Sequence, residues 1–302
     1  LRCLPFLILP GEKDMDTFLY IAQGAFEQGL IYSFMVMGLY VSYKILNVAD
    51  LTVDSSFTLG AAVSAVFTAM GLPWLGLLAG MLAGVLAGLV TGVLQTKLRI
   101  QPILAGILTM TGLYSVNLII MGKSTYSTAG KANVYSLLSF LPGKISKGVL
   151  LILLTAAGVA LLAWFFRTQV GMSVRATGDN EQMVRASSIN SDAMKLIGLA
   201  IANAFVALSG GLLQQYNSAA DISMGVGTVV IGLAAIVIGE VLIRRRGVVF
   251  GLLAAVLGSV IYRAICALVL QIGLDANYMK LFTALFITAA ISVPALKKTR
   301  GK

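Results

Sequence analysis

Eight long uncharged stretches dominate the chain, and one of them is about twice as long as most of the others. A bilayer has a hydrocarbon core about 30 Å thick, which roughly 20 apolar helical residues can cross. Charged residues make up 11% of the sequence, against about 25% in soluble domains, so much of the apolar surface must face lipid. The stretches are 28–43, 55–96, 100–122, 148–166, 196–220, 222–239, 247–262 and 281–296.

The sequence therefore predicts an all-α polytopic membrane protein. The turn Gly71-Leu72-Pro73 divides the longest stretch into two helices, which gives nine expected spans in one transmembrane domain, 15–302. Residues 1–14 lack an initial Met and carry two prolines in a short apolar run, so we expect a non-native or disordered extension there. The expected helices are 19–43, 57–71, 74–96, 102–122, 149–166, 194–215, 226–243, 248–272 and 280–296.

Basic residues are unevenly distributed between the two sides of this topology. Nine spans place the termini on opposite sides, and a cytoplasmic C-terminus puts 14 of the 22 Lys and Arg residues inside and seven outside. Cytoplasmic loops are enriched in Lys and Arg. We therefore expect the N-terminus outside and the C-terminus in the cytoplasm. The net charge of +10 then reflects membrane topology, and we expect no nucleic-acid partner.

The two halves of the chain resemble each other. Ala49-Asp50-Leu51-Thr52 follows the first expected span, and Ala220-Asp221-Ile222-Ser223 follows the sixth. Because five spans separate spans one to four from spans six to nine, equivalent helices run in opposite directions. Inverted repeats of this kind place a substrate path near the membrane midplane, between the halves.

A polar segment, 47–56, precedes a strongly apolar helix. Its Asp and Ser side chains are good helix N-caps, so a capping turn is one interpretation. The other is a broken helix that lines a route, because irregular backbone inside a membrane is tolerated only against protein or water. On that interpretation the candidate route residues are Asn47, Asp50, Asp54, Ser55 and, from the repeat, Asp221.

Five glycines recur at four-residue spacing in the third expected span, and each step of four falls on nearly the same helix face. Small residues let neighbouring membrane helices approach closely. We expect a packing seam here, with a substrate-lining groove as the alternative. The residues are Gly76, Gly80, Gly84, Gly88 and Gly92.

The polar segment 167–195 predicts a short cytoplasmic helix. Gly178 is expected to break the chain, Asp179 or Asn180 to cap the next helix, and 181–189 to be helical. Such a helix would transmit force to a soluble partner or would lie on the lipid headgroups. The chain has no His and no Gly-x-x-x-x-Gly-Lys-Ser/Thr loop. We therefore expect no catalytic or metal site, and no cofactor or ATP bound by this chain.

Two motifs resemble those of a known family. Gly171-x-x-x-Arg175-Ala176-x-Gly178-x-Asn180, followed by Ala186-x-x-Ile189-Asn190, resembles the coupling segment of ABC importer permeases of the branched-chain amino-acid and ribose superfamily. Ser187-Ser188 departs from the small-Gly pair common in that segment. The segment 44–62 is similar to the signature of one subgroup, whose members have uncharacterised substrates or are associated with tryptophan or tyrosine uptake.

The resemblance implies the membrane-spanning subunit of an importer in a prokaryotic inner or plasma membrane. Its implied partners are a second copy of the chain or a related permease, a cytoplasmic ABC ATPase dimer carrying ATP and Mg²⁺, and an extracytoplasmic substrate-binding protein. The expected cargo is a small solute, first an amino acid and in particular an aromatic one. A nucleoside or sugar cargo and an ion-coupled secondary transporter are the alternatives. The residues implied to couple to the ATPase are Gly171, Arg175, Ala176, Gly178, Asn180, Met183, Ala186, Ile189 and Asn190.

Overall fold

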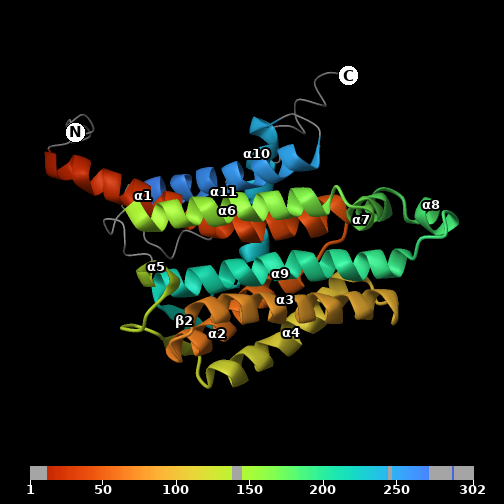
Figure 1. Ribbon diagram of the computed structural model, residues 1–302, viewed down its shortest axis with the longest axis horizontal. Coiled ribbons are helices and arrows are strands. Elements are labelled where there is room, and N and C mark those ends of the chain that lie inside the picture. Colours follow the sequence, from red (N-terminus) through yellow and green to blue (C-terminus); the bar gives the residue numbers. More distant parts are fainter. Residues whose placement is uncertain (1–11, 138–144, 244–246, 272–287, 289–302) are drawn as a thin grey trace, which may run out of the picture.

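The computed structural model describes residues 12–137, 145–243, 247–271 and 288. The described chain is almost entirely helical (Figure 1), with one short two-stranded antiparallel sheet. The expected ninth helix, 280–296, lies almost wholly outside the described residues, as do residues 1–11. The helices are α1 (Glu12–Leu39), the π-helical η1 (Tyr40–Ile45), α2 (Thr52–Ala69), α3 (Pro73–Thr96), α4 (Pro102–Met121), α5 (Val134–Leu137), α6 (Ile145–Phe165), α7 (Gln169–Asp179), α8 (Glu181–Ala186), α9 (Ser191–Asn217), α10 (Thr228–Leu242) and α11 (Val248–Gln271), and the strands are β1 (Thr125–Ser127) and β2 (Ala219–Asp221).

Five of the described helices are long and apolar enough to cross a membrane: α3, α4, α6, α9 and α11. α1 begins at Glu12, slightly before the expected start of the domain at Met15. α2 and α10 are shorter than α1 and than these five helices, with 18 and 15 residues. Nine spans remain a prediction, because the described residues do not include the last one.

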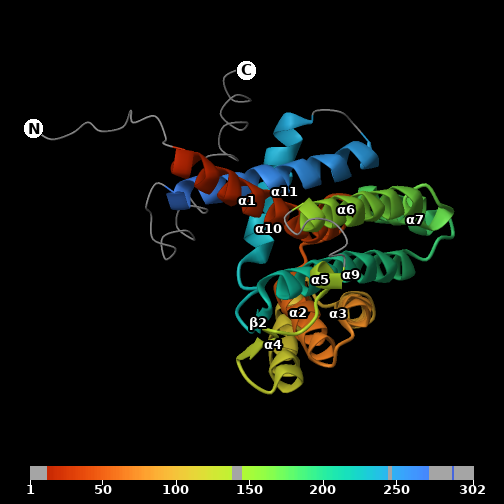
Figure 2. The same cartoon turned by 60° about the vertical axis from the view of Figure 1, so that its left-hand side comes forward.

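The helices form two groups that meet where α1 packs on α9 (Figures 1 and 2). In one group α9 packs on α2 and α3, and in the other α1 packs on α10 and α11. The first helix of each expected half therefore packs on the second and third helices of the other half. An inverted repeat would produce this reciprocal packing, since its halves exchange equivalent contacts.

The five glycines of α3 lie where this helix contacts α2 and α9. A Cβ at Gly76 or Gly80 would lie 3.1 Å from a backbone oxygen of α2. A Cβ at Gly84 or Gly88 would collide with the carbonyl oxygens of Asn203 and Leu199 on α9. At Gly92 it would lie 2.7 Å from a side-chain carbon of Leu196. The stripe thus allows two helices to approach the α3 backbone closely.

Two non-helical segments, 46–51 and 222–227, lead into the short helices α2 and α10. The first leaves η1 beside α7 and reaches Asp50, whose carboxylate accepts a hydrogen bond from Asn203 Nδ2 at 2.8 Å. Asn203 lies near the middle of α9, which is about 40 Å long at 1.5 Å per residue. α2 therefore begins deep inside the helix bundle, at Thr52 and not at the expected residue 57. The segment 47–56 is thus a short non-helical stretch followed by the first residues of α2, and a route along it stays a prediction.

Candidate functional site

The N-termini of the two short helices meet at Asp54, in the first turn of α2. The Asp54 carboxylate accepts hydrogen bonds from Gly227 N at 2.9 Å, Thr228 Oγ1 at 2.8 Å and Val229 N at 2.9 Å. The N-cap of α10 is Gly227, which has no side chain to cap the helix itself. Asp54 therefore caps α10 from another helix and places a negative charge at its partially positive end.

The two repeated Asp motifs have the same local geometry. Asp50 Oδ1 accepts from Thr52 N at 2.9 Å, and Asp221 Oδ1 accepts from Ser223 N at 2.8 Å. Asp50 is buried against α9, whereas Asp221 also accepts from Thr125 Oγ1 at 2.7 Å and so joins β2 to β1. The Ser223 hydroxyl also donates a hydrogen bond to the Asp221 carboxylate. These bonds stabilise the charged form and lower the pKa of Asp221 from its usual value, and the bond from the Ser223 hydroxyl contributes most.

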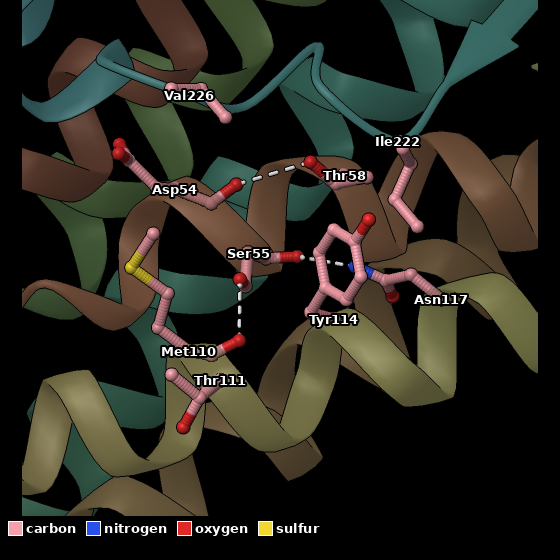
Figure 3. Close-up of a pocket in the computed structure, with 9 residues that line it drawn as sticks. All are labelled: Asp54, Ser55, Thr58, Met110, Thr111, Tyr114, Asn117, Ile222 and Val226. Atoms are coloured by element: carbon pink, nitrogen blue, oxygen red, sulfur yellow. Dashed lines mark hydrogen bonds between the residues drawn. The ribbon is translucent and has the colours of Figure 1, made fainter. Parts of the chain in front are cut away.

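A pocket of about 250 Å³ lies beside this meeting point (Figure 3). Ser55 Oγ donates to the Met110 carbonyl at 2.9 Å, and Asn117 Nδ2 donates to the Ser55 carbonyl at 3.2 Å. Asn117 is 1% exposed, yet its Oδ1 has no hydrogen-bond partner among the residues that the structure describes. A buried acceptor without a partner favours a ligand or water that donates a hydrogen bond. The pocket is lined by Asp54, Ser55, Thr58, Met110, Thr111, Tyr114, Asn117, Ile222 and Val226.

Two of the five candidate route residues, Asp54 and Ser55, line this pocket. Figure 3 shows the Asp54 carboxylate turned away from Ser55 and Asn117, in keeping with its bonds to α10. Asp50 and Asp221 are engaged elsewhere, and Asn47 is exposed in a left-handed backbone conformation with φ of 54°. The contribution of α4 was not among the expectations from the sequence. Its signal is Asn117, the only amide side chain in α4.

The segment 167–195 forms two short helices with side-chain caps. Thr168 Oγ1 caps α7 by accepting from Gly171 N at 3.2 Å, and Asn180 Oδ1 caps α8 by accepting from Met183 N at 3.1 Å. Asn190 Oδ1 caps α9 by accepting from Asp192 N and Ala193 N, both at 3.1 Å. The capping expected of Asn180 is thus present.

The role expected for Gly178 is wrong. α7 continues through Gly178 to Asp179, so this glycine neither breaks the chain nor adopts a special backbone conformation. A Cβ on Gly178 would instead collide with the Ile45 carbonyl oxygen of η1, and one on Gly171 would collide with the Phe165 carbonyl oxygen. Both glycines let α7 pack tightly against neighbouring backbone.

α8 is shorter than expected and exposes two apolar side chains. Val184 is 1% exposed and holds the helix to the rest of the chain, whereas Met183 is 58% exposed and Ala186 is also exposed. The helix ends at Ala186, so Ile189 lies beyond it and is half-buried. The expected three-residue face is therefore reduced to Met183 and Ala186. Of the other expected coupling residues, Arg175 is exposed and Ala176 is half-buried.

An ion-pair cluster fixes α8 relative to α9. Glu181 accepts from Lys195 Nζ at 2.7 Å and from Arg185 at 2.8 Å, and Arg185 also contacts Asp192 at 3.2 Å. The hydrogen bond from Lys195 is the main reason that the pKa of Glu181 lies below its usual value. The cluster keeps the exposed side of α8 in one orientation.

The chain matches a family model over residues 21–291, nearly its whole length. That model is described as the branched-chain amino acid transport system permease component. The chain belongs to this family of ABC permeases. The coupling motif and the subgroup expected from the sequence agree with this membership.

Curated relatives narrow the subgroup to which this permease belongs. A tyrosine transport system permease protein of Clostridioides difficile is 38% identical to this chain. The alignment covers 91% of this chain and 93% of the Clostridioides protein. An uncharacterised protein of Rickettsia prowazekii is 32% identical over 89% of this chain and 95% of its own. A ribose import permease of Haemophilus influenzae is 26% identical over 77% of this chain and 71% of its own. No solved structure matches the sequence.

The family membership and the apolar helices together indicate that the permease is a multi-pass transport subunit of the plasma membrane. Permeases of this family work with ATPases and substrate-binding proteins. Among the residues that the structure describes, no group of three or more His, Cys, Asp or Glu could hold a metal ion.

Proposed function

We propose that this permease imports an amino acid, in first place an aromatic one, through an ATP-driven complex. The observation that carries the substrate class is the 38% identity to a tyrosine transport permease over 91% of the chain. We place the N-terminus outside and the C-terminus in the cytoplasm, because that orientation puts most basic residues inside.

The complex that we propose has three kinds of subunit contact. A second copy of this permease pairs with the first, and an extracytoplasmic binding protein docks on the loop 123–147. An ATPase dimer, which carries ATP and Mg²⁺, docks against α7 and α8. The exposed Met183 and Ala186, on a helix fixed by the Glu181 cluster, support this last contact.

The route that we propose passes the meeting point of the two short helices. The unpartnered Asn117 Oδ1 would accept a hydrogen bond from an ammonium or hydroxyl group of the cargo, and Tyr114 offers an aromatic ring at 53% exposure. The pocket, about 250 Å³, is of the size of a small solute and below the range of roughly 300–1,000 Å³ typical of drug-sized ligands.

A chain of contacts leads from α7, which packs on α8, to this pocket. It supports a role for α7 and α8 in coupling. Gly178 of α7 packs on Ile45, and the next residue, Leu46, packs on Gly198 of α9. The segment 46–51 then leads to Asp50 and the start of α2, where Asp54 binds α10. A displacement of α7 would therefore reach both short helices through contacting backbone.

There are two alternatives, and the relatives support one of them. The ribose import permease relative supports a sugar as cargo, and a nucleoside ABC transporter permease of Lactococcus lactis, 28% identical, supports a nucleoside. An ion-coupled transporter would need a carboxylate free to bind an ion in the membrane. Asp50 and Asp54 are both engaged in hydrogen bonds, which disfavours that mechanism.

Uptake into proteoliposomes tests the proposal. The permease would be reconstituted with its ATPase and binding protein, with ATP presented to the ATPase side. Labelled tyrosine, tryptophan, ribose and a nucleoside would be offered separately. We expect ATP-dependent uptake of the aromatic amino acids above the other two solutes. Uptake by the permease alone, driven by an ion gradient, would contradict the ABC mechanism, and ATP-dependent uptake of ribose alone would contradict the substrate class.

A further inference from the structure

A second and larger cavity lies on the other side of α4, away from the Asn117 pocket. It is a groove of about 550 Å³ whose floor is α2 and whose walls are α3 and α4. Thr109 provides the only hydroxyl among the lining residues, and its Oγ1 donates to the Ala105 carbonyl at 3.0 Å. Among its lining residues the groove thus offers no free side-chain hydrogen-bond donor to a polar solute, which suits an alkyl chain.

The length of the groove fits one leaflet of a bilayer. Its α4 wall runs from Leu108 to Ile120, about 18 Å at 1.5 Å per residue. Half of a hydrocarbon core that is about 30 Å thick is about 15 Å. An acyl chain that enters from one membrane surface would therefore extend along the whole groove.

Two exposed basic residues lie at one end of the groove, in the short connection between α3 and α4. The groove-facing positions of α3 end at Leu94, and Lys97 follows one helical turn later, with Arg99 just beyond. Neither has an acidic partner within 4.0 Å among the described residues. This is the same end of the molecule as α7 and α8, since Gly92 packs on Leu196 near the start of α9.

We infer that this groove binds one anionic phospholipid, with an acyl chain between α3 and α4 and its phosphate at Lys97 and Arg99. Lipid tails are as apolar as the lining side chains, so the groove holds the chain by packing and does not select the lipid class. Selection comes from the two positive charges, each of which contributes about a fivefold preference for an anionic headgroup. This inference is independent of the transport function proposed above.

Gly112 allows the acyl-chain site to be tested separately from the charges. It lines the groove, and a Cβ placed on it would meet no atom within 4 Å. Gly112→Phe should therefore fill the groove without disturbing the helices around it. Among the described residues, Gly24 of α1 likewise has no atom within 4 Å of an added Cβ, and it does not line the groove, so Gly24→Phe is the matched control.

The experiment is native mass spectrometry of the purified full-length permease after equilibration with equimolar phosphatidylglycerol and phosphatidylcholine of identical chains. We expect one retained lipid per chain, with phosphatidylglycerol preferred by at least about tenfold. Lys97→Gln with Arg99→Gln should bring the ratio close to one. Gly112→Phe should lose both lipids, and Gly24→Phe should behave as the parent protein.

Three results would overturn the inference. The first is equal retention of the two lipids by the parent protein. The second is an unchanged preference in the double variant. The third is a Gly112→Phe protein that still retains lipid but no longer forms a dimer, because the groove would then be an interface between two copies of the chain.

Discussion

Asp54 connects α2 and α10, two helices that belong to different halves of the sequence. Its carboxylate accepts three hydrogen bonds from the first turn of α10 while the residue itself begins α2 and lines the Asn117 pocket. Any movement that separates the two short helices must break these bonds. A residue chosen from the sequence as a route candidate thus has a structural role that the sequence pattern did not specify.

Asp54→Ala should lower the thermal stability of the permease. It removes charge-assisted bonds at a helix N-terminus, and we expect a loss of about 2 kcal/mol, or a fall of roughly 4–8 °C in Tm. Uptake should fall as well, because the two helices are no longer held together. Thr111→Val is the control, since Thr111 lines the same pocket but donates only within α4. Unchanged stability of Asp54→Ala would show that the cap contributes nothing.

Glu181 gives α8 a defined pH dependence. Its folded pKa lies below the usual value of 4.5, so its contribution to stability is present above pH 4.5 and is lost as the pH falls through the lower, folded value. We expect hydrogen exchange of the α8 amides to stay slow from neutral pH to about 4.5 and to rise below it, after correction for the intrinsic rate. Glu181→Gln should remove this transition. A transition that persists in Glu181→Gln would have to come from another group.

At the scale of elements, the glycine spacing predicted close helix contacts that the structure contains. The four-residue period of α3 marks one face of a helix, and that face lies against α2 and α9. The apolar stretches likewise predicted eight helices that the described residues contain, with boundaries displaced by up to seven residues. Periodicity and apolar length suffice here because both are local properties of the sequence.

Gly84→Leu should prevent correct assembly of α3 with α9. A Cβ at this position would collide with the Asn203 carbonyl oxygen and lie 2.5 Å from Ala207 Cβ, so a larger side chain must force the helices apart. We expect little monodisperse protein after purification, measured by size-exclusion chromatography. Gly24→Leu has free space around its Cβ and should purify as the parent does. A Gly84→Leu protein with the parent's yield and Tm would show that α3 does not pack there.

Contacts between distant segments could not be predicted in the same way. Asp54 and Gly227 are 173 residues apart, and no local pattern indicates that one caps the helix that follows the other. Gly178 was interpreted as a helix breaker because glycine is common at helix ends, whereas the structure places it within α7 against Ile45. Whether a glycine serves a turn or a close approach depends on its neighbours in space, which the sequence does not name.

At the scale of the whole molecule, we propose that the chain provides a route and a connection to it, and that a separate ATPase supplies the energy. The Asn117 pocket lies at the meeting point of two short helices, and contacts through Ile45 and Leu46 connect it to α7. α8, fixed by the Glu181 cluster, exposes Met183 and Ala186. The central claim is that a separate ATPase docks on α8 and moves the short helices through this connection.

The Ala186→Asp variant tests this claim most directly. The measurement is the rate of ATP hydrolysis by the reconstituted complex, with and without loaded binding protein. The substitution places an unpaired carboxylate in a contact that becomes buried on docking, at a cost of a few kcal/mol. The variant should insert in the membrane normally, lose the co-purifying ATPase and lose substrate-stimulated hydrolysis, while Ala186→Ser should retain both. Co-purification of Ala186→Asp with the ATPase at the parent's yield, together with normal stimulation, would contradict the assignment of α8 as the coupling helix.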